Sequence, residues 1–123
     1  MHKIEDLKIW KKSLELTKLV YRIVSFLPSD EKYGLISQIK RSSVSIPSNI
    51  AEGAGRNSNK EFKYFLSIAN GSCYELQTQL ILTTELNLIS KKEIEPVINA
   101  IIEIQKMNYS FQKSLEKTLN TQY

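Results

Sequence analysis

Apolar side chains recur every three or four positions along four stretches of the chain, and this spacing is that of one face of an α-helix. In the third stretch, for example, Phe62, Leu66, Ala69 and Cys73 follow this period. The sequence contains neither a convincing strand pattern nor an internal repeat. It therefore predicts an all-α protein with helices over residues 6–27, 30–54, 59–87 and 91–119.

Prolines and capping motifs mark where these helices begin and end. Pro28 ends the first helix, and Pro47 is expected to kink the second without ending it. Ser58 and Ser90 each precede a glutamate by three residues, which is the spacing of a capping box, so they should begin the third and fourth helices. Because the breaks span only a few residues, we expect one domain over residues 1–123, an antiparallel up-down four-helix bundle.

The composition is that of an ordinary globular domain. The chain has 123 residues, of which 41% are hydrophobic and 24% charged. Its single cysteine, Cys73, cannot form an internal disulfide. No apolar run approaches the roughly 18 residues of a membrane span, and the N-terminus lacks the apolar region of a signal peptide. A cytoplasmic protein without a membrane partner is expected.

The residue types that carry catalysis or bind metals are almost missing. The only histidine, His2, lies next to the N-terminus, and Cys73 lies on the apolar stripe of the third helix, where a nucleophile is not expected. A di-iron bundle would need Glu-x-x-His pairs, and the two glycines of residues 52–56 match no phosphate-binding loop. We therefore expect no enzymatic activity, no metal and no cofactor.

The second helix is rich in small and polar residues. Antiparallel pairing about the turn at residues 53–58 brings Arg41 to within about one helical turn of Glu75, among apolar neighbours. One interpretation is a buried network that fixes helix register, because a buried arginine without a carboxylate would be costly. The other is that Arg41, with Arg56 and its polar neighbours, faces a partner. The predicted network comprises Gln38, Arg41, Ser45, Asn49, Glu52 and Glu75.

The charge balance adds a possible nucleic-acid role. There are 17 Lys+Arg against 13 Asp+Glu, a net charge of +4, and the isoelectric point is about 9.1. The cations gather on the polar side of the first helix and at the start of the third, where free amides could also attract phosphate. The alternative is a set of ordinary solvated lysines. The candidate nucleic-acid-binding residues are Lys8, Lys11, Lys12, Lys18, Arg22, Arg56, Lys60 and Lys63.

Two features suggest self-association. Gly71 lies inside the third helix, where glycine costs about 1 kcal/mol relative to alanine, so a close neighbour is expected there. That neighbour would be another helix of the bundle or another subunit. Apolar residues off the narrowest core lines of the first and fourth helices also need cover, either by a wider intramolecular stripe or by a second copy: Ile9, Leu16, Ile98 and Ile102.

Several short motifs together resemble a known family. They are LKIW at residues 7–10, YGL at residues 33–35, SIPSNIAEG at residues 45–53, and GS and EL at residues 71–72 and 75–76. Spread over nearly the whole chain, they make it similar to the four-helix bundle family of 23S rRNA intervening-sequence proteins.

This resemblance implies partners as well as a fold. Members of the family resemble the accessory protein of diversity-generating retroelements, a ring-forming bundle that binds a reverse transcriptase and nucleic acid. The resemblance implies a homopentamer that contacts RNA or DNA, or an RNA-handling protein, and it supplies no catalytic residues. We therefore expect a non-enzymatic, oligomeric binding or scaffold protein. The alternative is a structural protein–protein interaction module with no nucleic-acid role.

Overall fold

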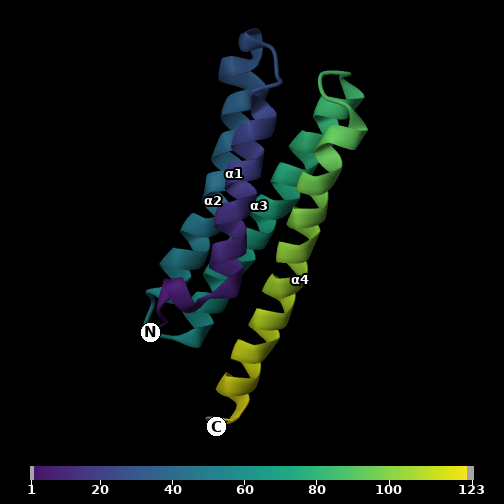
Figure 1. Ribbon diagram of the computed structural model, residues 1–123. Coiled ribbons are helices and arrows are strands. Elements are labelled where there is room, and N and C mark those ends of the chain that lie inside the picture. Colours follow the sequence, from purple (N-terminus) through teal and green to yellow (C-terminus); the bar gives the residue numbers. More distant parts are fainter. Residues whose placement is uncertain (1, 122–123) are drawn as a thin grey trace.

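Four long helices pack as an antiparallel bundle (Figure 1). The structure is a computed structural model that describes residues 2–121, with side chains up to residue 117. The helices are α1 (Lys8–Val24), α2 (Ser37–Ala54), α3 (Asn59–Glu85) and α4 (Lys91–Thr121). Each packs on the next, and α1 also packs on α4. The part of the chain described contains no strand, so the predicted all-α, up-down bundle is confirmed.

The ends of the first two helices differ from the prediction. The first α-helix is shorter than residues 6–27 at both ends: a separate 3-10 turn, Ile4–Asp6, precedes α1, and α1 ends at Val24, after which the N–H groups of residues 25–27 bond three residues back rather than four. After Pro28 the chain forms a 3-10 turn and then the π-helical turn Lys32–Ile36, in which the backbone leaves helical geometry at Gly34 (φ −109°, ψ −110°). The α2 helix therefore begins at Ser37 rather than near residue 30.

Both predicted serine caps form, but each glutamate carboxylate contacts the serine hydroxyl rather than the serine backbone N–H that completes a capping box. The Oγ atom of Ser58 accepts a hydrogen bond from the backbone N–H of Glu61 at 3.2 Å, and its hydroxyl lies 3.2 Å from the Glu61 carboxylate. Ser90 and Glu93 repeat this arrangement at the start of α4. These contacts satisfy N–H groups that the first turn of each helix leaves unpaired.

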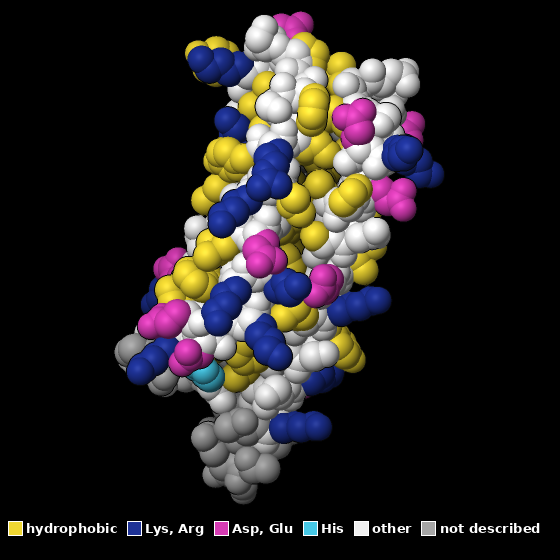
Figure 2. Space-filling model, in the orientation of Figure 1, with side chains coloured by type: hydrophobic (Ala, Val, Ile, Leu, Met, Phe, Trp, Pro, Cys, Tyr) yellow, Lys and Arg dark blue, Asp and Glu magenta, His cyan; other side chains and the backbone are white. Residues whose placement is uncertain are grey.

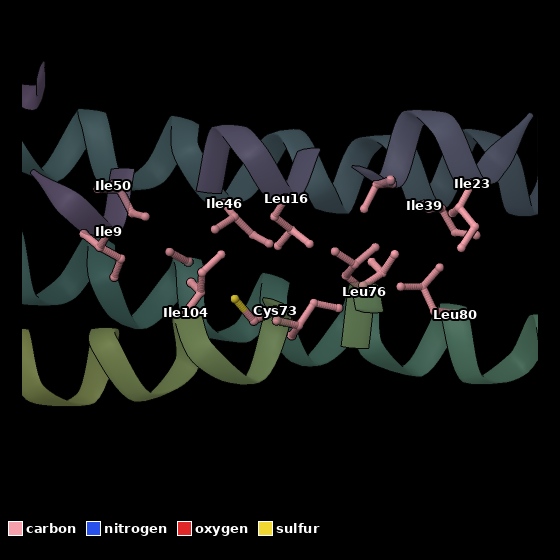
Figure 3. Packing of buried hydrophobic residues seen from close by; sticks show 14 of the residues in the cluster. Ile9, Leu16, Ile23, Ile39, Ile46, Ile50, Cys73, Leu76, Leu80 and Ile104 are labelled. Atoms are coloured by element: carbon pink, nitrogen blue, oxygen red, sulfur yellow. The ribbon is translucent and has the colours of Figure 1, made fainter. Parts of the chain in front are cut away.

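Side chains from all four helices meet in a single apolar core (Figure 3). Ile9 and Leu16 of α1 point into it and are only 2% and 1% exposed. The suggestion that these two residues need cover from another subunit is therefore wrong, because α1 buries a wider stripe than the narrowest core line. Ile98 and Ile102 of α4 are half-buried.

The α2 and α3 helices lie in close contact beside the turn that joins them. A Cβ atom added to Gly53 would lie 2.8 Å from Cδ1 of Phe62 and 2.8 Å from Cβ of Phe65. Real Cβ atoms do not come so close to other carbon atoms. The glycine in the SIPSNIAEG motif is thus the residue that lets the start of α3 lie against the end of α2.

The α2 helix continues through Pro47, whose side chain is buried. Proline has no N–H, so the carbonyl of Ser43, four residues earlier, loses its helical donor. The hydroxyl of Thr17 on α1 partly replaces it: Oγ1 lies 3.2 Å from the Ser43 oxygen and 2.9 Å from the oxygen of Ser13 in its own helix, so its one hydrogen is shared between the two carbonyls. A side chain of α1 therefore compensates for the proline of α2 and ties the two helices together.

We expect the Thr17→Val substitution to lower the free energy of unfolding by about 1 kcal/mol, because the Ser43 carbonyl loses its donor. Thr78→Val is the matched control, since the exposed Thr78 hydroxyl bonds the Tyr74 carbonyl of its own helix, at 2.8 Å, and no other described residue. Urea denaturation monitored by circular dichroism measures both. Equal midpoints for the two variants would contradict this role of Thr17.

Replacing Gly53 with alanine should destabilise the protein by about 1–3 kcal/mol, because the new methyl group has no room against the phenylalanine side chains. On helix propensity alone the same change would be stabilising. Gly55→Ala is the control, because a Cβ atom there would have its nearest neighbour at 3.6 Å. Thermal unfolding in which Gly53→Ala melts at or above the wild-type temperature would refute the close approach.

Candidate functional site

The outer face of α1 carries a row of positive charges. Its buried residues, among them Ile9, Leu16 and Val20, face the core, and the helical period turns the remaining positions toward solvent. Figure 2 shows Lys and Arg side chains spread along this face, with acidic and apolar side chains between them. The structure places five predicted candidates there, all exposed: Lys8, Lys11, Lys12, Lys18 and Arg22.

Few carboxylates neutralise this row. Lys12 Nζ lies 3.4 Å from Glu103 Oε1 of α4, and Glu15 is exposed on α1 itself. Within the described residues, no ion pair engages the other four cations of the row. Since an exposed ion pair contributes roughly 0–1 kcal/mol, even Lys12 remains available to a polyanion.

A hollow of about 460 Å³ lies beside this row, between α1 and α2. Lys18, Tyr21 and Arg22 border it, together with Thr17 and Val44. The hollow thus combines two cations with an aromatic side chain, and its other borders include the apolar Val44.

The second predicted basic group is less free. Arg56 lies 3.1 Å from the Glu52 carboxylate and 4.8 Å from the ring centroid of Phe65. Lys63 pairs with Glu116 of α4. Lys60 is exposed near the start of α3. Because two of these three cations already contact carboxylates, this group has fewer unpaired cations to bind phosphate than the α1 row has.

The predicted buried pair of Arg41 and Glu75 is wrong. Both residues are exposed, and among the described residues no ion pair joins them. Arg41 instead donates a hydrogen bond to the side chain of Gln38, one turn earlier. The cause is rotational: the residue of α2 that faces α3 at this level is Ser42, whose hydroxyl donates to Gln79 at 2.7 Å.

The remaining members of the predicted network form two separate groups. The hydroxyl groups of Ser45 and Ser72 lie 2.7 Å apart, and Asn49 Nδ2 donates to the backbone oxygen and to Oγ of Ser45 at 2.8 and 3.0 Å. Glu52, near the end of α2, pairs with Arg56 in the turn that follows. The six residues therefore do not form one buried network, although Ser45 does link α2 to α3.

The sequence did not predict a row of polar side chains that lies between α3 and α4. Asn108 is 1% exposed, and its Nδ2 donates to the Leu66 carbonyl at 2.9 Å, while Gln112 donates to its Oδ1 at 2.6 Å. Gln105 donates to Gln77 at 3.3 Å. The signal for these polar side chains is the three- and four-residue spacing of residues 105, 108 and 112 on the apolar side of α4.

The described residues show no arrangement typical of catalysis. Cys73 is buried, and loss of solvation raises the pKa of its thiol to about 12, so a thiolate does not form at neutral pH. No cluster of three or more metal-ligating residues lies within the described part. None of the described helices has the length and apolarity needed to cross a membrane.

Comparisons with known proteins agree with the fold and the motifs. The family model for 23S rRNA-intervening sequence proteins matches residues 5–110. A crystal structure of a protein of unknown function from the S23 ribosomal protein family of Bacteroides thetaiotaomicron is 30% identical, with a TM-score of 0.79, and the match covers 85% of this chain and 98% of that one. No curated protein matches. The chain belongs to the family of 23S rRNA-intervening sequence proteins.

Proposed function

We propose that this protein is a non-enzymatic, self-associating bundle that binds RNA along the outer face of α1. The observation that carries the proposal is the row of exposed cations that extends from Lys8 to Arg22. At a rise of about 1.5 Å per residue, the row spans roughly 21 Å, enough to contact several phosphates of one strand. The family is named for intervening sequences of 23S rRNA, and this association with an RNA is our reason to propose RNA as the polyanion.

Binding of this kind is electrostatic. Lysine and arginine side chains on an exposed helix contact phosphate oxygens and release counterions, so affinity falls steeply as salt rises. Such contacts position a strand without reading its bases. The proposed role is therefore that of a scaffold, which holds RNA or presents it to an RNA-handling protein, and it requires no catalytic group.

Self-association would multiply the number of phosphate contacts, and the residues on the outer face of α3 support self-association. Gly71 is exposed there, and an added Cβ atom would meet nothing within 4 Å. Packing within one chain therefore does not explain why α3 carries this glycine, which lowers the stability of the helix. Ile68 and Leu82 on the same helix are 37% and 42% exposed, and Glu75 lies exposed between them. A homopentamer, which the family resemblance implies, would repeat the α1 face five times around an axis.

Neutralising three cations of the row, in a Lys11→Gln/Lys18→Gln/Arg22→Gln variant, should weaken RNA binding about tenfold or more and reduce the slope of log Kd against log salt by about two. Fluorescence anisotropy with labelled RNA at several salt concentrations measures this. A Lys32→Gln/Lys91→Gln/Lys92→Gln variant controls for net charge, since these lysines are exposed elsewhere. Equal losses of RNA affinity in both variants would show that α1 is not the binding site. Salt-insensitive or undetectable wild-type binding would favour the protein-interaction module.

The Gly71→Leu variant should shift the protein to a lower mass in size-exclusion chromatography with light scattering, because the new side chain would block the proposed contact. Asn99→Leu, at an exposed position of α4, should leave the mass unchanged. A wild-type mass of 14.2 kDa at micromolar concentration, or a Gly71→Leu variant that assembles normally, would contradict self-association through this face.

A further inference from the structure

Two adjoining hollows form a groove along the outer seam of α3 and α4. They have volumes of about 320 and 430 Å³, and both are lined by Gln105 and Tyr109. Tyr74 of α3 and Lys106 of α4 line the larger hollow, and Asn70 is among the residues that line the smaller one. The groove thus joins aromatic, amide and cationic side chains in one place, which neither the α1 face nor the outer face of α3 does.

Amide side chains of fixed orientation line the groove. Buried Asn108 accepts the hydrogen bond of Gln112, and Gln105 donates to Gln77. Gln112 also accepts a hydrogen bond from the Ser67 hydroxyl at 3.4 Å. Each amide has two donor hydrogens and an acceptor oxygen with two lone pairs, so one N–H and part of the oxygen's accepting capacity remain on both Gln105 and Gln112. Asn70 is half-buried, and among the described residues no side-chain hydrogen bond engages it. Amides held in this way can bond the edge of a planar ligand that carries both donors and acceptors.

Two tyrosines supply flat surfaces beside these amides. Tyr74 is 59% exposed and Tyr109 is 66% exposed, one from each helix. Lys113 Nζ lies 5.5 Å from the centroid of the Tyr109 ring. Exposed aromatic rings next to cations are the arrangement on which single-stranded nucleic acids stack their bases.

The local charge also suits a polyanion. Lys63, Lys106 and Lys113 border the groove, against the single carboxylate of Glu116. Glu116 pairs with Lys63 and lies 3.5 Å from Lys113. The hydrogen bond from Lys63, with the nearby charge of Lys113, lowers the pKa of the Glu116 carboxyl, so it is ionised at neutral pH and the local balance is three positive charges to one negative.

We infer that this groove binds the bases of single-stranded nucleic acid: Tyr74 and Tyr109 stack on them, the amides of Gln105 and Gln112 contact their edges, and the lysines contact phosphates. A duplex hides its base faces in the stack, so only a single strand can use the tyrosines. The inference rests on the proposed RNA binding and adds to it a preference for unpaired strands. The α1 row, in contrast, contacts phosphates of either form.

The test compares single and double Tyr74→Leu and Tyr109→Leu variants of the full chain by anisotropy, with a labelled 12-nucleotide single strand and a 12-base-pair duplex of RNA. Both tyrosines are exposed, so folding should be kept, and thermal unfolding checks this. We expect the double variant to lose about tenfold or more in affinity for the single strand, with the duplex affinity unchanged. Tyr33→Leu, at an exposed tyrosine between α1 and α2, should lose less than twofold.

A second probe, adenosine monophosphate, separates this inference from the proposed function. In saturation-transfer NMR, its base protons should receive saturation from the wild-type protein and much less from the double tyrosine variant. The triple α1 variant should transfer as much saturation as the wild type. Three outcomes would refute base binding in the groove. They are equal losses of affinity for single strand and duplex in the tyrosine variants, polyglutamate that competes for the protein as strongly as RNA does, and a nucleotide signal that the double variant leaves unchanged. If only the α1 variant weakens RNA binding, the proposed function stands and the groove inference falls.

Discussion

The tight packing of α2 on α3 is the contact on which the rest of the molecule depends. Gly53 lets the start of α3 approach, and hydroxyl contacts continue along the pair, from Ser45 with Ser72 to Ser42 with Gln79. Only small side chains allow two helix backbones to remain so near over several turns. The serines of α2 lower its intrinsic helix propensity, and these contacts between helices offset that loss. This packing also sets which residues of α2 and α3 face solvent.

Polar groups inside the bundle fix its geometry where apolar side chains alone would not. Thr17 supplies the donor that Pro47 removes, and Asn108 bonds a carbonyl of α3 from within α4. Among the described residues every buried side-chain nitrogen or oxygen has a hydrogen-bond partner. Hydrogen bonds are directional, so each of these pairs restricts helix rotation and register more narrowly than leucine or isoleucine contacts do.

Helical periodicity and capping chemistry made most of the fold predictable. The four helices, both serine caps and the exposure of the α1 cations follow from residue spacing alone. The direction in which a side chain points from the helix axis is harder to predict, because an error of one residue turns it by 100°. The sequence indicated that Arg41 would face Glu75, yet the neighbouring Ser42 faces α3 and bonds Gln79, and both charged residues are exposed. The π-helical turn before α2 also escaped prediction, since neither spacing nor capping encodes it.

The arrangement of the helices separates the cationic face of α1 from the outer face of α3. The strong contacts of α1 are with α2 and α4, and those of α3 are with the same two helices, so α1 and α3 occupy diagonal corners. The cationic face of α1 therefore points away from the outer face of α3, and the groove beside α4 opens on a third side. A second copy on α3 would leave the α1 row uncovered. A short strand held in the groove of one copy would reach the α1 row only by passing around α4, or through a neighbouring copy in an assembly. Self-association and phosphate binding by the α1 row can thus operate together, because the diagonal placement keeps these two surfaces apart, whereas Tyr74 of the groove lies only one helical turn from Gly71.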